Sequence, residues 1–352
     1  MKKELLMGTA LVSTLGAASV AEAVTATMSG NHQTGLMFSD PTTGQETRSQ
    51  INDNNFTVSL SETTDGGVTI SSSFMLMNEA GGGSSDEDAG FSLAFTDGSK
   101  LDVLNAGNAS GSHDISIPAS AGAESVTITC TNHAPTGLDF AAGSTVYGIE
   151  YHTAADFLAD GLSMSFSLST DNNASSTTTY ASDGHVALGG TYVTDLGDSA
   201  VTVGFGYSAG EGSIAGTGPS SDENGVHIGV SAVTGDLTVA VGFADGDDIA
   251  STTASTPVLE VDGSVMKAGV KYVTGDLTFN VGITSGEGSD NAFGSAGTGS
   301  DDGYDKTSAS ISYAVASGVT AYLGYSDVDS NNEGQNDSTD GSAWYIGANM
   351  SL

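Results

Sequence analysis

A repeat of about 40 residues runs through the last two thirds of the chain. It aligns five short alternating runs, placing Tyr151, Tyr192, Ala232, Tyr272 and Tyr313 at one position with spacings of 41, 40, 40 and 41 residues. Each run leads through a tight turn into a second alternating run, and then into a long loop of Asp, Asn, Gly and Ser. Gly and Asp in the tight turns supply the backbone conformations that short hairpins need. The repeat unit is therefore a β-hairpin plus a long loop.

Apolar and polar side chains alternate within these runs. Leu277, Phe279, Val281 and Ile283 are separated by Thr, Asn or Gly. Successive side chains of a strand point to opposite faces, so each strand has one apolar and one polar face. Two-faced strands with short turns at one end and long loops at the other are typical of a transmembrane β-barrel. The aligned tyrosines lie near the short turns, where an aromatic girdle meets the membrane interface.

The pattern predicts an all-β fold, a transmembrane 16-stranded antiparallel β-barrel with an even strand number and a lumen wide enough for water. Gly contributes 49 of the 352 residues, which disfavours helices. The expected strands cover residues 24–38, 55–63, 67–78, 89–96, 99–104, 144–154, 161–171, 185–194, 199–209, 225–233, 237–244, 264–273, 276–285, 307–316, 319–327 and 342–352.

The first 23 residues have the pattern of a cleaved signal peptide. Lys2 and Lys3 precede an apolar stretch, and the residues from Ala21 to Ala23 form an A-x-A cleavage site. We therefore expect residues 24–352 to form one barrel domain. Cys130 is the only cysteine, so an intrachain disulfide is impossible despite export.

Composition excludes several classes of function. The formal charge of −36, from 43 acidic and 7 basic residues, would repel nucleic acid. The six His show no H-x-x-H or H-E-x-x-H spacing, and the lone Cys130 lacks a local catalytic signature, so enzymatic function is unsupported. One alternative to a barrel remains, an acidic secreted or surface structural β-protein. A solenoid of that kind would repeat every ~20 to 30 residues.

Several segments resemble general diffusion porins of the alphaproteobacterial type, a family of Gram-negative outer-membrane porins. They are VTATMSGNHQTGLMF from Val24, GFSLAFTDGSKLDVLNAGNA from Gly90, the TGD hairpins and the closing WYIGANMSL. The chain departs from the family by ending in Leu352 rather than Phe. The resemblance implies a homotrimer in outer-membrane lipid that lets small hydrophilic solutes and ions diffuse passively through a water-filled channel.

The resemblance also implies that the third external loop folds into the barrel. The connection from Asn105 to Gly143 takes its place and carries Asp114, Glu124 and Asp139 but no Lys or Arg, which predicts an acidic pore constriction; a long exposed loop is the alternative. By the alternation rule, the basic residues that face the lumen are Lys100, Lys267 and Lys271. We therefore expect a mostly negative lumen that prefers cations.

No cofactor is expected to be required, but clusters of carboxylates in the external loops suit calcium, which prefers hard oxygen ligands. The alternative is solvated surface charge. The candidate ligands are Asp245, Asp247, Asp248, Asp327, Asp329 and Glu333.

Overall fold

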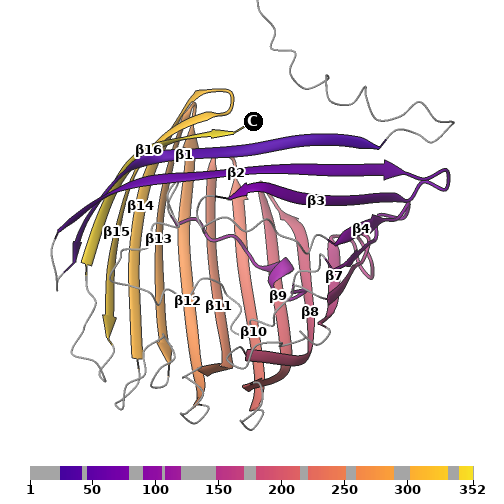
Figure 1. Ribbon diagram of the computed structural model, residues 1–352. Coiled ribbons are helices and arrows are strands. Elements are labelled where there is room, and N and C mark those ends of the chain that lie inside the picture. The colour runs from indigo at the N-terminus through magenta and orange to yellow at the C-terminus, as the bar shows by residue number, and fades with distance from the viewer. Residues whose placement is uncertain are drawn as a thin grey trace, which may run out of the picture.

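The computed structural model describes residues 24–41, 46–78, 90–104, 108–119, 148–169, 180–214, 221–250, 259–288, 302–331 and 341–351. The expected signal peptide, residues 1–23, lies outside them. The described strands form one closed antiparallel barrel, in which every strand pairs with its neighbours in sequence and β1 pairs with β16 (Figure 1). The predicted fold class is confirmed. Among the described residues no helix is long and apolar enough to cross a membrane.

The strands, in chain order, are β1 (Thr25–Pro41), β2 (Thr47–Thr63), β3 (Thr69–Asn78), β4 (Phe91–Ala94), β5 (Lys100–Val103), β6 (Gly148–His152), β7 (Leu162–Ser169), β8 (Tyr180–Leu196), β9 (Ser199–Ile214), β10 (Ser221–Thr234), β11 (Leu237–Ala250), β12 (Leu259–Thr274), β13 (Leu277–Gly288), β14 (Asp302–Ala316), β15 (Val319–Asn331) and β16 (Gly341–Ser351).

Each of these strands overlaps one expected from the sequence, and the differences lie mainly at the long-loop ends. There β2 begins at Thr47 instead of residue 55, and β12 begins at Leu259 instead of residue 264. Backbone pairing continues at these ends through polar residues such as Asn52 to Asn55, which pair with residues 31–34 of β1. The outward residues of this part of β2, Arg48, Gln50 and Asn52, are polar, so no apolar alternation marks it and the pattern understates the length of the strand.

The tight turns at the other end have the conformation that their glycines predict. Gly197, Gly235, Gly275 and Gly318 all have positive φ, between 56° and 75°. An L-residue with a Cβ is strained in this region, whereas Gly is not. These turns fix the register of the hairpins, as in the pairing of Thr274 with Leu277 around Gly275.

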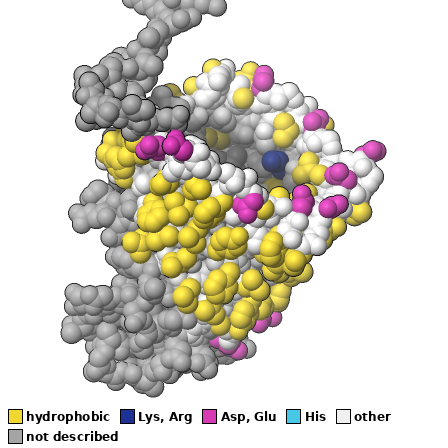
Figure 2. All heavy atoms as spheres, turned by 90° about the vertical axis from the view of Figure 1, so that its right-hand side faces the viewer, with side chains coloured by type: hydrophobic (Ala, Val, Ile, Leu, Met, Phe, Trp, Pro, Cys, Tyr) yellow, Lys and Arg dark blue, Asp and Glu magenta, His cyan; other side chains and the backbone are white. Residues whose placement is uncertain are grey.

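Alternation separates an apolar outer wall from an inner wall that combines polar side chains with an apolar cluster of Met37, Tyr322, Val328, Ala343 and Tyr345. On β13, Phe279, Val281 and Ile283 are 39%, 52% and 48% exposed, whereas Asn280 between them is 7% exposed. The aligned tyrosines are likewise exposed on the outer wall. Hydrophobic side chains cover much of the outer wall in Figure 2, around a hollow rimmed by acidic side chains. The outer wall therefore presents the apolar surface that lipid requires.

Candidate functional site

A segment after β5 lies inside the barrel. Residues 108–119 include the short 3-10 helix η2 (Gly111–His113) and run along the inner faces of β8 to β13. The segment belongs to the connection that was expected to fold inward, and it crosses the lumen in Figure 1 as the violet strap beside β9. The inward-folded loop of the predicted fold is therefore present.

A row of glycines on the inner wall forms a groove for this segment. A Cβ added at any of these positions would lie closer than 3.0 Å to an atom of the segment, a separation that real Cβ atoms essentially never show. Only Gly lets the backbone of a ligand or a loop approach a strand so closely. The glycines are Gly189, Gly204, Gly206, Gly229, Gly269 and Gly282.

Sequence reasoning missed this groove, although the repeat contains its signal. Gly189, Gly229 and Gly269 are spaced by 40 residues, and each lies three positions before an aligned residue of the repeat. Successive side chains of a strand point to opposite faces, so a residue three positions before an outward tyrosine position points inward. A glycine recurring at an inward position of neighbouring hairpins thus indicates a surface against which another backbone packs.

Hydrogen bonds fasten the segment to the wall. His113 lies with Nδ1 2.7 Å from Oγ1 of Thr191 and Nε2 2.8 Å from Oγ of Ser165. The hydroxyl of Ser112 donates to Oε1 of Glu150 over 2.7 Å. Burial lowers the pKa of His113 to about 4, and charge on His152 and His227 adds to the effect. His113 is therefore neutral at pH 7 and able to bond both hydroxyls.

Asp114, one of the predicted constriction acids, lies on this segment. Its Oδ1 is 3.1 Å from Nδ1 of His227 on β10, and Nε2 of the same ring lies 2.8 Å from the carbonyl oxygen of Ser110. A carbonyl oxygen only accepts, so Nε2 carries the proton of the hydrogen bond to Ser110, and Nδ1 faces the carboxylate of Asp114. The other two predicted acids, Glu124 and Asp139, lie outside the described residues.

The predicted basic residues all lie on inward faces. Lys100 on β5 forms an ion pair of 2.7 Å with Asp102. Lys267 on β12 interacts electrostatically with Asp114 and Lys306, and Lys271 pairs across the sheet with the buried Asn280. Lys306 also faces inward, because its cross-strand partner is the buried Val328. It was missed because the strand was expected to begin at residue 307, whereas β14 begins at Asp302.

Charges of both signs line the described part of the inner wall, and a mostly negative lumen stays a prediction. Strand register brings carboxylates onto the same faces as the lysines. The inward basic residues are Lys100, Lys267, Lys271 and Lys306, and the inward acids include Asp53, Asp102, Asp114, Glu150 and, by its alternation with Thr191 on β8, Asp195.

The candidate calcium ligands fall into two groups on different strands. Asp245, Asp247 and Asp248 belong to β11, and the carboxylate of Asp247 accepts a 2.6 Å hydrogen bond from Asn224. Asp327 and Asp329 belong to β15, with β12 to β14 between the two groups, and Glu333 lies outside the described residues. Calcium binding by these loops stays a prediction.

Within the described residues, one group has the spacing of metal ligands. It consists of Asp102 on β5 with Glu150 and His152 on β6, whose ligand atoms all lie within 4.8 Å of one another. Asp102 pairs across the sheet with Glu150, and Lys100 pairs with His152. More than forty residues separate β5 from β6, so the register between these two strands cannot be derived from the sequence.

Comparisons with known proteins agree with this architecture. The chain matches the family model of Gram-negative porins over residues 8–334. A search of curated protein sequences gives no match. Among solved structures, an anion-selective porin from Comamonas acidovorans is similar, with a TM-score of 0.65 at 11% identity over 94% of this chain and 100% of that one.

Two further structures are similar at the same level. A porin refined at 1.8 Å resolution has a TM-score of 0.60 at 18% identity over 93% of this chain and 100% of that one. The trimer form of OmpT, an outer-membrane protein of Vibrio cholerae, has a TM-score of 0.57 at 14% identity over 94% of this chain and 100% of that one. At these identities the likeness is one of fold.

Proposed function

Because the chain belongs to the Gram-negative porin family, we propose that this outer-membrane barrel is a water-filled channel that conducts small hydrophilic solutes and prefers cations. The observation that carries the proposal is the segment of residues 108–119, which is seated against the inner wall and narrows the lumen. A seated segment makes the passage narrow without closing it. Solutes then pass by diffusion, and no catalytic chemistry is involved.

The cation preference is proposed to depend on the acids of the inward connection. The described inner wall carries charges of both signs, so a net bias depends on the charge close to the narrow zone. Glu124 and Asp139 are the acids that the same connection adds to Asp114, and it adds no Lys or Arg. A tenfold preference corresponds to only about 1.4 kcal/mol. One or two incompletely screened carboxylates can supply that difference.

Reversal potentials under a KCl gradient test this selectivity. Replacing Asp114, Glu124 and Asp139 together by Asn or Gln is expected to move the reversal potential toward neutrality, and the matched replacement Asp53→Asn, on the inner face of β2, is expected to change it less. Raising salt from 0.1 M to 1 M should weaken the preference, because the Debye length falls from about 10 Å to about 3 Å. An anion-selective wild-type channel would refute the proposal, and the anion-selective porin among the similar structures makes that outcome a real alternative.

We also propose that the protein is a homotrimer, as the resemblance implies. The trimer form of OmpT from Vibrio cholerae, with the same fold, supports this. Native mass spectrometry of the protein in detergent tests the oligomeric state, and a purely monomeric species that conducts ions would contradict it.

A further inference from the structure

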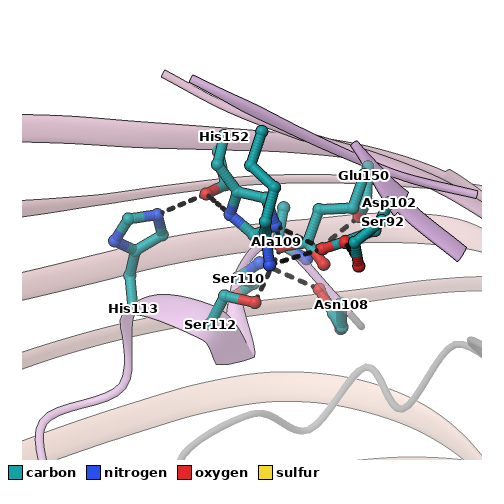
Figure 3. Close-up of polar contacts among 12 residues, drawn as sticks. Ser92, Asp102, Asn108, Ala109, Ser110, Ser112, His113, Glu150 and His152 are labelled. Atoms are coloured by element: carbon teal, nitrogen blue, oxygen red, sulfur yellow. Dashed lines mark hydrogen bonds and ion pairs between the residues drawn. The ribbon is translucent and has the colours of Figure 1, made fainter. Parts of the chain in front are cut away.

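A compact cluster of ionisable side chains lies where the inward segment meets β5 and β6. Nε2 of His152 lies 2.9 Å from Oδ2 of Asp102 and 3.6 Å from Oε1 of Glu150. Nδ1 of the same ring lies 2.8 Å from Oγ of Ser165, which also contacts Nε2 of His113. Figure 3 shows His152 between His113 on one side and the two carboxylates on the other.

The two carboxylates of this cluster are buried but incompletely compensated. Asp102 is 4% exposed and Glu150 is 1% exposed. The ammonium of Lys100 forms an ion pair with Asp102, whereas Glu150 contacts the hydroxyl of Ser112 and the ring of His152. With a neutral ring the cluster therefore holds two negative charges and one positive charge. Buried charge is costly unless it is paired or bound to a metal.

We propose that Asp102, Glu150 and His152 bind a divalent transition-metal ion, with Zn²⁺ as the representative. Zn–O and Zn–N bonds of about 2.0–2.2 Å place tetrahedral ligand atoms about 3.4 Å apart, close to the 2.9 Å and 3.6 Å separations present here. The mixture of one imidazole and two carboxylates suits Zn²⁺ better than Ca²⁺ or Mg²⁺, which favour oxygen alone. Three protein ligands leave the fourth position to water from the lumen.

The hydrogen bonds around the cluster allow Nε2 of His152 to be the ligand. When Nδ1 of His152 donates to Ser165, the hydroxyl of Ser165 donates to Nε2 of His113, and Nδ1 of His113 donates to Thr191. Every donor in this chain then has an acceptor, and Nε2 of His152 keeps a free lone pair that faces both carboxylates. Such an outer hydrogen bond is what fixes the orientation of histidine ligands in metal sites.

Lys100 acts as an internal competitor for the metal. Its ammonium lies 2.7 Å from Oδ2 of Asp102, the same atom that would bind the ion, yet the side chain is 43% exposed and free to move toward the lumen. A metal must displace it and tolerate its charge nearby. Removing that charge is therefore expected to strengthen binding, whereas removing a ligand weakens it.

Calorimetric titration of the refolded full-length mature protein with ZnCl₂, in detergent and with excess Mg²⁺ to occupy surface acids, tests this. Glu150→Gln and His152→Asn should each weaken Zn²⁺ binding by at least about 10-fold, a size usual for damage to a metal site. Lys100→Gln should tighten it on the order of 10-fold. Asp53→Asn removes one inward carboxylate outside the cluster and should change binding less than either ligand variant.

The proposal predicts changes of opposite sign, because the ligand variants weaken Zn²⁺ binding whereas Lys100→Gln strengthens it. Equal Zn²⁺ affinity in the wild type, Glu150→Gln and His152→Asn would overturn the proposal, and so would weaker binding in Lys100→Gln. If a ligand variant does not give the heat-modifiable gel shift of a folded barrel, Lys100→Gln against Asp53→Asn still gives the answer. The readout is binding in detergent, so it is independent of conductance and of the proposed ion selectivity.

Discussion

Gly282→Ala tests whether the inward segment rests on the wall as described. A Cβ at this position on β13 would lie 2.6 Å from Cα of Ala119 and 2.7 Å from the carbonyl oxygen of Pro118. Ordinary contact begins at 3.4 Å, so the segment must retreat by 3.4 − 2.6 = 0.8 Å. Both neighbours are backbone atoms, and neither can rotate away as the end of a long side chain would.

The expected magnitude follows from overpacking, which costs about 1–3 kcal/mol. The barrel is folded whether the segment is seated or displaced, so the restriction of the unfolded chain by Ala does not enter this equilibrium. The seated segment should therefore lose on the order of 1–3 kcal/mol relative to a displaced one, which is a factor of roughly 5–150 in their ratio.

Single-channel recording in planar bilayers is the assay. The variant should show lower mean conductance and more current noise, because the segment moves into the lumen and leaves the wall more often. Gly66→Ala is the matched control in the β2–β3 turn, since its Cβ would meet only Oγ1 of Thr64 at 3.9 Å. Wild-type conductance and noise in a correctly folded Gly282→Ala channel would refute a seated segment.

Two further predictions concern the outer wall and pH. Phe279→Lys should cost roughly 2–4 kcal/mol of unfolding free energy near the bilayer midplane, whereas Phe279→Leu should not; equal costs in denaturant titrations in lipid would show that the face is misassigned. The pKa of His113 is lowered from 6.5 to about 4 in the seated segment, so its stabilisation is complete above pH 6.5 and is lost as pH falls toward 4. Current noise should rise over that interval in the wild type, and His113→Asn should lack this dependence.

The sequence predicts the barrel well where strands carry apolar alternation for the lipid face and end in short glycine turns. From β8 onward the repeat aligns hairpins, and the positive-φ glycines such as Gly235 and Gly275 mark their turns. At the long-loop ends neither signal is present, because outward residues there are polar, as Gln50 on β2 and Asp305 on β14 are, and the loops vary in length. The sequence therefore did not predict that β2 begins at Thr47 or that β14 begins at Asp302. The inward position of Lys306 on β14 was missed for the same reason.

Parts of the site were unpredictable for a different reason, since they depend on pairing between distant residues. Asp102 meets Glu150 only through the register of β5 with β6, and the long connection between them carries no information about that register. The groove differs, because Gly189, Gly229 and Gly269 recur with the period of the repeat. Their inward position can be obtained from alternation alone.

The formal charge of −36 and a lumen wall that carries charges of both signs are compatible because they describe different regions of the molecule. Many of the acids belong to turns, loops and outward strand ends, such as Asp236 in a tight turn and Asp245 near the end of β11. At 0.1 M salt a charge is screened over about 10 Å, so acids at the mouth raise the local cation concentration without acting across the whole barrel. Discrimination at the narrow zone then depends on the few charges held there, where water is scarce and screening is weaker. Asp114 is one of these charges, and its pairing with His227 and its proximity to Lys267 limit how much it contributes alone.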